Sequence, residues 1–310
     1  MFDIIIEQIN AKEVFKGGEL KLKVSVITNL SVGYDIVKVD DTKEKIAEIE
    51  NVIAPEIVGY SVKDLEFVDS ILSELNLDPL STMPVSISLA RSLSNALDFP
   101  LFKLIGGFLI SELPTVASNI LTDKTNYLFP IIMAESIDEI IEVYLILKSK
   151  LDNKYILSNE CYLCNNIFDE VSYIREMIDE IKEDEDIDIL LGLSGKKEVL
   201  KGKDLSLIDY LETEEPIEFD GFLCTENLCE ESDFIKVNPY ELSTISELSY
   251  YINYINEKDL TPVIFGDNTS LAHIATGFKI PLIRTSLTSN ILNEVWNIER
   301  ELYNPNISRF

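Results

Sequence analysis

The chain has 310 residues, of which 46% are hydrophobic, so it is long enough to bury a sizeable core in one or two domains. Its net charge of -29 and pI near 4.3 argue against binding to nucleic acid or to an anionic membrane, and an anionic ligand would need a local cationic pocket. The N-terminus lacks the residue order of a signal peptide, and no apolar run approaches the ~20 residues that span a bilayer, so we expect a cytoplasmic protein.

Residues 3–38 alternate apolar and polar positions in three short runs, IIIEQI, LKLKVSVIT and VGYDIVKV. Turn residues at 16–18 and 29–31 separate the runs, which predicts a three-stranded meander. Amphipathic patterns that predict helices follow over residues 42–53, 62–75 and 82–97. Strands followed by helices predict a small α+β domain over residues 1–112.

After about residue 113 the pattern changes to short apolar runs that alternate with helical segments. The runs with the length of buried strands are 116–121, 128–133, 154–157, 187–193, 217–224, 234–237, 262–265 and 281–283. The helical patterns between them are 137–150, 168–182, 205–211, 241–256, 270–277 and 290–302. This alternation predicts a parallel sheet with helical crossovers, and its strands would close into a (β/α)8 TIM-type barrel over residues 113–310. The segment is near the lower limit of about 200 residues for such barrels, so its loops must be short.

One lysine lies where such a barrel would place a reactive group. Lys236 interrupts the apolar run FIKV one residue before its end, and the C-terminal ends of barrel strands carry the site. A lysine there either reaches past the strand end to solvent or projects into the barrel mouth as a reactive amine. Lys236 is therefore a candidate catalytic residue.

Several stretches have counterparts, in the same order, in one known family. ENVIAPEIVGYSVKDLEFVDSILSEL is similar to a helix–I-A-P-x-L-I-G–helix segment, and MPVSISLARSLSNALDFPLFKLIGG to A-I-L-G-V-S-L-A-x-A-x-A-x-A-x-x-x-P-L-Y-x-Y-L-G-G. Towards the other end, DFIKVNPYELSTISEL is similar to I-L-I-K-x-N-Q-I-G-T-L-T-E-T. These pieces cover most of the chain and together resemble enolase. The resemblance implies an N-terminal α+β capping domain followed by a trimmed TIM-type barrel.

Enolases dehydrate 2-phosphoglycerate to phosphoenolpyruvate. A lysine on the sixth barrel strand removes the proton, a glutamate assists loss of hydroxide, and three carboxylates hold magnesium, which stabilises the dianionic intermediate. The resemblance matches Lys236 to the base and Glu160, in SNECYLCNN, to the assisting glutamate. Arg284 stands where a second family lysine contacts the substrate, which keeps the charge but changes the donor geometry.

Other positions depart from the family pattern. Ser194, in LLGLSGKK, stands where the family has a magnesium-binding aspartate, and serine is a poorer ligand for this ion. The strand that should end in S-I-E-D-P, with a ligand glutamate, is missing between Pro216 and Asp220 in this comparison, and Asp220 aligns with the first aspartate of D-D-L-x-V-T. The mobile S-G-A-S-T lid loop has no counterpart between Tyr34 and Thr42. Magnesium should therefore be held weakly, and hydratase activity should be lost or very weak.

Four cysteines form two close pairs. Cys161 and Cys164 directly follow Glu160, and Cys224 and Cys229 follow the fifth expected strand. In a barrel both pairs would lie at the mouth, where four thiolates could hold zinc or an iron–sulfur cluster. A redox dithiol at Cys161 and Cys164, or four ordinary reduced thiols, are the alternatives.

The stretch GKKEVLKGK, residues 195–203, is rich in lysine and is either an anion-binding patch at the barrel mouth or a solvated loop. Three functions remain open. The first is an enolase-related protein with a degenerate site that binds a small carboxylate or phosphate, or a protein partner. The second is a working carbon–oxygen lyase that uses Lys236, Glu160 and Arg284. The third is a thiolate metalloprotein. The resemblance also implies a homodimer formed through the N-terminal domain.

Overall fold

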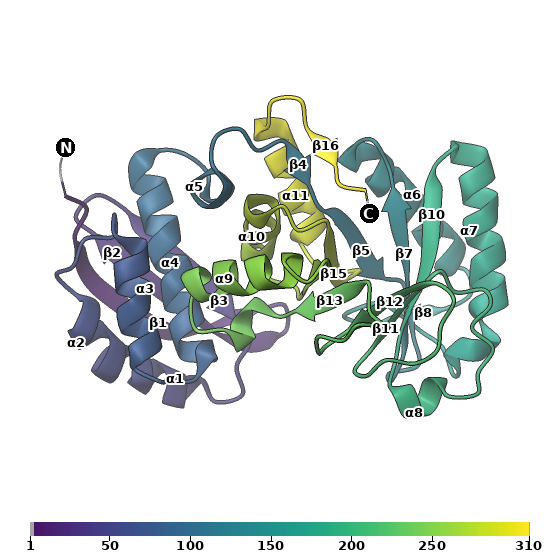
Figure 1. The fold of residues 1–310 in the computed structure, drawn as a ribbon, viewed down its shortest axis with the longest axis horizontal. Helices are drawn as coiled ribbons and strands as arrows, with labels where there is room; N and C mark the ends of the chain where they lie inside the picture. The colour runs from purple at the N-terminus through teal and green to yellow at the C-terminus, as the bar shows by residue number, and fades with distance from the viewer. Residues whose placement is uncertain (1–2, 310) are drawn as a thin grey trace. The chain divides into compact units, whose positions relative to one another are not determined.

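The computed structural model of the chain describes residues 3–309, which divide into two compact units (Figure 1). The first unit comprises Met1–Phe108 and Asn238–Tyr254, and the second comprises Leu109–Val237 and Ile255–Phe310. The division falls at residue 108, where the sequence predicted a boundary at 112. It also assigns residues 238–254, which were expected in the second domain, to the first unit.

The first unit begins with the predicted meander, which the structure confirms. Strands β1 (Ile6–Lys16), β2 (Glu19–Thr28) and β3 (Val32–Val37) pair antiparallel in the order β1-β2-β3. Gly17 and Gly18 both have positive φ, 66° and 83°, which suits the two-residue turn that joins β1 to β2. Alternate residues of β2 are buried, so one face of the meander forms the core of this unit.

Helices follow the meander in chain order: α1 (Thr42–Glu48), a π-helical turn (Ile49–Ile53), α2 (Ala54–Ile57), α3 (Leu65–Glu74), α4 (Pro79–Leu97) and α5 (Leu101–Gly106). The longest of them, α4, is buried along most of its length. Ser31 Oγ donates to the carbonyl oxygen of Ser92 at 2.6 Å, which ties the turn before β3 to α4. The predicted α+β character of this unit is therefore confirmed.

Residues 238–254 contribute a 3-10 turn (Pro239–Glu241) and most of α9 (Ile245–Asn256) to the first unit. The N-terminus of α9 is capped by Asp69 of α3. Its Oδ2 accepts from the backbone N–H of Ser246 at 3.0 Å and from the Ser246 hydroxyl at 2.7 Å. Asp69 Oδ1 accepts from Ser86 at 2.8 Å. Burial raises the pKa of the Asp69 carboxyl, which the Ser246 and Ser86 hydrogen bonds partly offset.

The second unit is built on an 11-stranded sheet of order β5-β15-β14-β13-β12-β11-β10-β7-β6-β9-β8. The strands, in chain order, are β5 (Thr115–Asn119), β6 (Leu121–Thr122), β7 (Tyr127–Met133), β8 (Ile156–Leu157), β9 (Tyr162–Leu163), β10 (Asp188–Ser194), β11 (Tyr210–Thr213), β12 (Phe222–Thr225), β13 (Phe234–Val237), β14 (Thr261–Phe265) and β15 (Leu282–Ser286). From β5 through β15 to β10 all neighbours are parallel. A separate pair, β4 (Glu112–Leu113) and β16 (Asn306–Ile307), lies outside this sheet.

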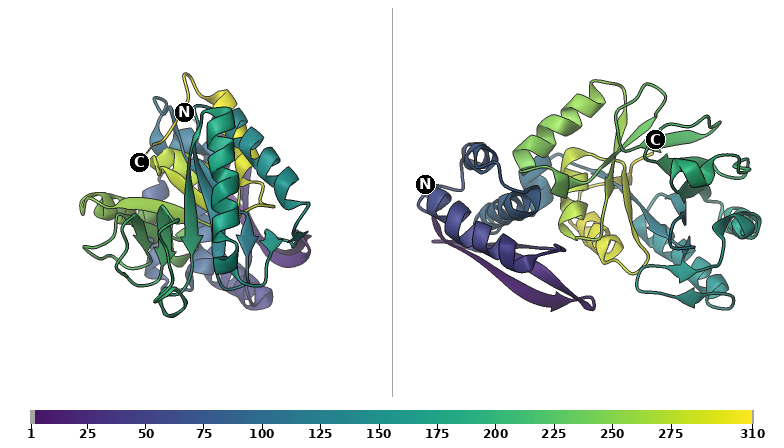
Figure 2. Two further views of the ribbon diagram at one scale, coloured as in Figure 1. Left: turned by 90° about the vertical axis from the view of Figure 1, so that its right-hand side faces the viewer. Right: turned by 90° about the horizontal axis from the view of Figure 1, so that it is seen from below.

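Strand β7 runs antiparallel to β10, so the prediction of a wholly parallel sheet is wrong. The connection from β5 to β7 contains only β6 and a turn, which is too short for a helical crossover. The sheet is curled, as the two views in Figure 2 show. Thr115 Oγ1 of β5 donates to the carbonyl oxygen of Ile132 in β7 at 2.9 Å. Directly after β5, the N–H of Ile120 donates to the carbonyl oxygen of Leu128 in β7 at 2.8 Å.

Two element predictions fail in this unit. The run 154–157, expected as a barrel strand, contains only the two-residue strand β8, whose Ile156 is 77% exposed, so its apolar residues do not mark a buried strand. Residues 205–211, expected as a helix, lead instead into β11, whose four residues are all buried. β11 is therefore a buried strand of the sheet, between β10 and β12, that the sequence did not predict.

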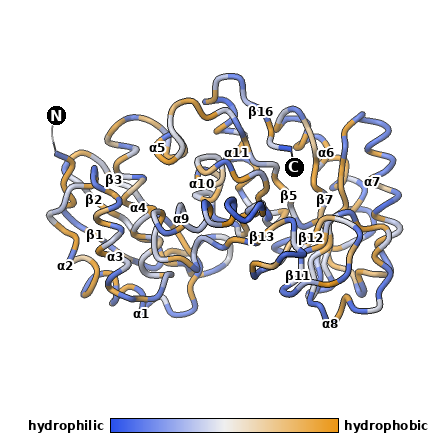
Figure 3. The backbone as a smooth tube through the Cα atoms, in the orientation of Figure 1, coloured by the Kyte–Doolittle hydropathy of each residue, from blue (hydrophilic) through white to orange (hydrophobic). Residues whose placement is uncertain are grey.

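Eight residues on strands of this sheet form a buried cluster: Ala117, Phe129, Ile131, Tyr210, Cys224, Phe234, Val263 and Leu282. β7 and β10 are mainly hydrophobic along their length, in contrast to the hydrophilic segments around them (Figure 3). The helices of the unit are α6 (Ile137–Leu151), a 3-10 turn (Ile167–Asp169), α7 (Val171–Glu185), α8 (Lys197–Leu200), α10 (Ser270–Phe278) and α11 (Ile291–Glu301). In residues 3–309, no helix is both long enough and apolar enough to cross a membrane.

Candidate functional site

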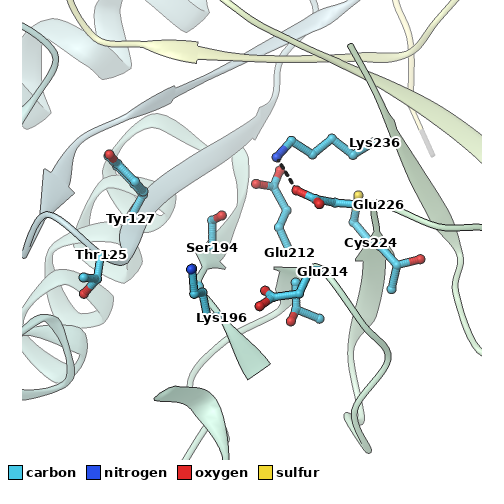
Figure 4. Close-up of a pocket in the computed structure, with 12 residues that line it drawn as sticks. Thr125, Tyr127, Ser194, Lys196, Glu212, Glu214, Cys224, Glu226 and Lys236 are labelled. Carbon is cyan, nitrogen blue, oxygen red and sulfur yellow. Dashed lines mark hydrogen bonds and ion pairs between the residues drawn. The ribbon is translucent and has the colours of Figure 1, made fainter. Parts of the chain in front are cut away.

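A cavity of about 310 Å³ lies in the second unit at the C-terminal ends of its parallel strands. Ser194 ends β10, Glu212 and Thr213 end β11, Cys224 and Thr225 end β12, and Lys236 lies near the end of β13. Figure 4 shows Tyr127 and Thr125 on one side, Lys236, Glu226 and Cys224 on the other, and Ser194, Lys196, Glu212 and Glu214 between them. The sequence predicted a site at this end of the strands around Lys236.

The register of the parallel strands places three cavity-lining residues side by side. Ser194 is paired with Glu212, and Glu212 with Cys224, across three parallel strands. The chain then turns at Gly195, where an added Cβ would lie 2.3 Å from Asn126 Oδ1. Only a glycine allows the β10 end to pass this close to Asn126 without a shift of the Asn126 side chain.

Asn126 belongs to a turn that Asp123 organises. Asp123 Oδ1 accepts from the backbone N–H groups of Thr125 at 3.0 Å and Asn126 at 2.8 Å. Burial alone would raise the pKa of the Asp123 carboxyl, but its hydrogen bonds from Thr125 and Asn126 outweigh this and lower the pKa to about 2. The turn brings Thr125 and Tyr127 to the cavity wall.

Arg284 lies beneath the cavity and is fully engaged with the protein. Its Nε donates to Glu212 Oε1 at 2.7 Å, its Nη1 to the carbonyl oxygen of Ala117 at 2.8 Å, and its Nη2 to Asn119 Oδ1 at 2.8 Å. Its guanidinium carbon is 3.1 Å from the centre of the Phe129 ring. The Arg284 side chain is 1% exposed and does not line the cavity, so the structure gives the expected substrate contact at Arg284 no support.

Lys236 does line the cavity, and it pairs with a carboxylate there. Its Nζ lies 3.0 Å from Glu226 Oε1, and 4.5 Å from the centre of the Phe265 ring. The Lys236 side chain is 27% exposed, so it neither snorkels fully to solvent nor is sealed in the core. A lysine abstracts a proton only as the neutral amine, and an adjacent carboxylate stabilises the ammonium form.

Glu212 carries one oxygen that the protein leaves without a partner. Oε1 is bound by Arg284, whereas Oε2 is buried, has no hydrogen-bond partner in residues 3–309, and belongs to a side chain that is 5% exposed. A buried carboxylate oxygen without a partner is unfavourable, so a donor from outside the chain is expected to meet it.

Glu160 and Asp220, two further predicted site residues, do not line the cavity. Glu160 is exposed, and its carbonyl oxygen accepts from the N–H of Leu287 at 2.8 Å. Burial raises the pKa of the Tyr127 hydroxyl, and the negative charge of Glu160 adds to this, which places Glu160 near the Tyr127 side of the cavity. Asp220 is exposed and precedes β12, at the strand end opposite the cavity. Ser194 lines the cavity as expected from its place at the end of β10.

The four cysteines do not come together. Within residues 3–309, no three or more His, Cys, Asp or Glu side chains are grouped closely enough to hold a metal ion. Burial raises the pKa of Cys161 to about 12 and that of Cys164 to about 11, and the pKa of Cys224 is also raised by burial. Cys229 Sγ lies 2.7 Å from the Ser232 hydroxyl. The geometry therefore does not form a four-thiolate site.

Sequence reasoning missed three carboxylates of the cavity, Glu212, Glu214 and Glu226. Glu212 was hidden because residues 205–211 were interpreted as a helix, so the strand that contains it was considered missing. The signal that would have found it is the run YLETEEP at residues 210–216, in which a glutamate follows an apolar pair and precedes Glu-Pro. Glu226 directly follows the four-residue strand β12, in CTENL.

The chain is 21% identical over 353 residues to an enolase from Methanosphaera stadtmanae, and the match covers 85% of each protein. This is a distant similarity to an enolase over most of the chain, and no family model matches. The chain is also 58% identical over 314 residues to the uncharacterized protein MJ0198 of Methanocaldococcus jannaschii, over the full length of both. The chain belongs to the same family as that protein.

Proposed function

We propose that this chain is an enolase-related protein that has lost efficient phosphopyruvate hydratase activity and keeps its cavity to bind a small polar ligand. The single observation that carries this proposal is the pair of internal ion pairs, Arg284–Glu212 and Lys236–Glu226. In each pair, a cation of the chain already binds a carboxylate that an enolase-type site would use to bind a metal ion.

The fold supports the relationship to enolases. We propose that β5, β7 and β10 to β15 form a closed barrel of eight strands, in which the hydrogen bonds from Thr115 and Ile120 to β7 complete the circle. The first unit, with its meander and helices, would then be the capping domain of the family. This arrangement agrees with the distant similarity over 85% of the chain.

The positions of the cavity carboxylates support a common origin with the magnesium site. Glu212 lies near the end of the fourth barrel strand, where the family motif S-I-E-D-P carries its ligand glutamate. Glu226 follows the fifth strand, where the family has the first aspartate of D-D-L-x-V-T. We propose Glu226, in place of Asp220, as the counterpart of that aspartate. Ser194 holds the position of the remaining ligand.

The donor set does not fit magnesium. Arg284 binds one oxygen of Glu212, Lys236 binds one oxygen of Glu226, and Ser194 offers only a neutral hydroxyl. Magnesium requires near-octahedral oxygen ligands and usually one or two free carboxylates, and a cation already at each carboxylate opposes a second one. The hydratase reaction therefore lacks the charge that would stabilise its dianionic intermediate.

The test is conversion of 2-phosphoglycerate to phosphoenolpyruvate with excess magnesium, compared between the wild type, Lys236→Ala and Lys197→Ala. Lys197 is a matched control, because it also forms a single lysine–glutamate ion pair, with Glu215 at 2.9 Å, but does not line the cavity. We expect no rate above background in any of the three. A magnesium-dependent rate that Lys236→Ala removes and Lys197→Ala keeps would overturn the proposal.

One observation favours a second function, a working lyase with Lys236 as the base. Lys236 is in the cavity, on the strand that the family uses for its base, and Glu226 could release it when a ligand enters. Glu160 would then assist from the Tyr127 side. The same assay decides between the two functions, and repeating it with other 2-hydroxy and 2-amino acids extends it to a changed substrate.

A further inference from the structure

The cavity wall contains two charges that the chain does not neutralise. Lys196 is exposed and forms no ion pair within residues 3–309, and Glu214, which is half-buried, forms none there either. The neighbouring Lys197 pairs with Glu215, so the absence of a pair at Lys196 is not a general property of this loop. A negative group on a ligand suits Lys196, and a positive group suits Glu214.

The buried oxygen of Glu212 adds a second and independent requirement. Oε2 has no partner in the described chain, lies in the cavity wall, and belongs to a residue that is 4% exposed. Because Arg284 already fixes Oε1, the carboxylate cannot turn away to find another donor. A ligand that brings a hydrogen-bond donor to this point satisfies this oxygen, and a protonated amine is the strongest such donor.

The size and total charge of the cavity narrow the chemical class of ligand that it could bind. A volume of about 310 Å³ is at the low end for ligand sites, which favours a small ligand. The carboxylates of Glu212, Glu214 and Glu226 are balanced by Lys196, Lys236 and the underlying Arg284. A site that is neutral in total but separated in charge fits a ligand that is itself neutral and dipolar.

We propose that this cavity binds a small zwitterion, a free α-amino acid or an amino carboxylate of similar size. Its ammonium group lies at Glu212 Oε2 and Glu214, and its carboxylate lies at Lys196. In Figure 4, Ser194 lies next to Lys196, so its hydroxyl can donate to the same carboxylate. This inference rests on the proposed function and names its ligand class. 2-Phosphoglycerate has a carboxylate and a phosphate but no cationic group, so it would bring only negative charge to a cavity that already contains three carboxylates. A simple amine would leave Lys196 without an anionic partner.

The test is isothermal titration calorimetry of the whole chain with the twenty common amino acids. Each amino acid that binds is then compared with the amine that lacks its carboxylate and with the acid that lacks its amine. We expect at least one amino acid to bind, and both truncated analogues to bind at least ~10-fold more weakly. The result that overturns the inference is binding of no amino acid, or binding of a deaminated acid as tightly as its amino acid.

Two variants test which residue binds each end of the ligand. Lys196→Ala should weaken amino-acid binding about 10-fold and leave binding of the matched amine unchanged, because only the carboxylate contact is lost. Glu214→Gln should weaken both the amino acid and the amine. Lys197→Ala is the control and should bind as the wild type does. Equal affinity in wild type and Lys196→Ala would also contradict the inference.

The binding experiments test the ligand class, whereas the hydratase assay tests the proposed function, so their outcomes can be told apart. A magnesium-dependent hydratase rate would overturn the proposed function itself. No hydratase rate together with no amino-acid binding would leave the loss of the parent reaction standing and remove only the ligand class. Both Lys196 and Glu214 lie at partly exposed positions, so neither substitution is expected to prevent folding.

Discussion

Arg284 donates from Nε to Glu212 Oε1 at 2.7 Å, and both side chains are buried. A buried ion pair is retained only when its remaining donors are also satisfied, because desolvation of both charges is costly. The Arg284 guanidinium meets this condition through Ala117 and Asn119. The pair therefore fixes Glu212 in position and supplies positive charge beneath the cavity from within the chain.

Replacing Arg284 by Ala should lower the free energy of unfolding by about 3–5 kcal/mol, because it leaves Glu212 charged and buried. The measurement is urea unfolding at neutral pH. Lys150→Ala is the control, since Lys150 forms an exposed pair with Glu180 at 2.8 Å and should cost no more than about 1 kcal/mol. The double variant Arg284→Met with Glu212→Leu should recover much of the loss. Equal effects of Arg284→Ala and Lys150→Ala would show that the buried pair is not structural.

Asp69→Ala should destabilise the docking of α9 by about 1–3 kcal/mol, since Ser246 and Ser86 lose the acceptor that caps the helix. Hydrogen exchange should report faster exchange at the first turn of α9. The control is Asp98→Ala, at an exposed helix C-terminus. Unchanged exchange in α9 would mean that the cap contributes nothing to the position of that helix.

Asp123 makes a pH-dependent contribution with a defined sign. Its pKa is about 2 in the folded chain and 3.8 ordinarily, so the unfolded chain binds the proton more readily between these values. The stability that the Asp123 carboxylate supplies is complete above about pH 4 and is lost as the pH falls toward 2. The difference in urea midpoint between the wild type and Asp123→Ala should therefore shrink on acidification. A difference that stays constant from pH 7 to pH 3 would contradict this account.

The cysteines should be unreactive in the native protein. Because burial raises the pKa of Cys161 to about 12 and of Cys164 to about 11, few thiolates form at pH 8. In a Cys229→Ser variant, the remaining three thiols should react with Ellman's reagent much more slowly than in the urea-unfolded chain. Elemental analysis should find no stoichiometric zinc or iron. Retention of one metal ion per chain through dialysis would restore the thiolate-site hypothesis.

Much of the fold could be predicted because its elements carry clear local patterns. The meander has alternating runs with turn residues, and α6, α7 and α11 have amphipathic repeats. β11 could not be identified in this way, because a four-residue apolar pattern is compatible with either a strand or the end of a helix. Only its pairing with neighbouring strands distinguishes the two. The exposure of β8 could not be predicted either, because hydrophobicity alone does not distinguish a buried apolar run from an exposed one.

The candidate site was predictable only in part for a related reason. Lys236 could be placed because one charge stands out in an apolar run. The role of Arg284 could not be, since its partners Glu212, Ala117 and Asn119 lie far from it in sequence and meet it only through the curl of the sheet. An arginine at a strand end predicts a cation but not whether it faces a ligand or the core.

The most direct test of the central claim is magnesium binding at the cavity, measured by calorimetry on the wild type and on Glu226→Gln. Surface carboxylates of a chain with net charge -29 will give weak, unsaturable heats in both proteins. If Arg284 and Lys236 occupy the carboxylates as proposed, the two titrations will be the same. A saturable magnesium site in the wild type that Glu226→Gln removes would contradict the account.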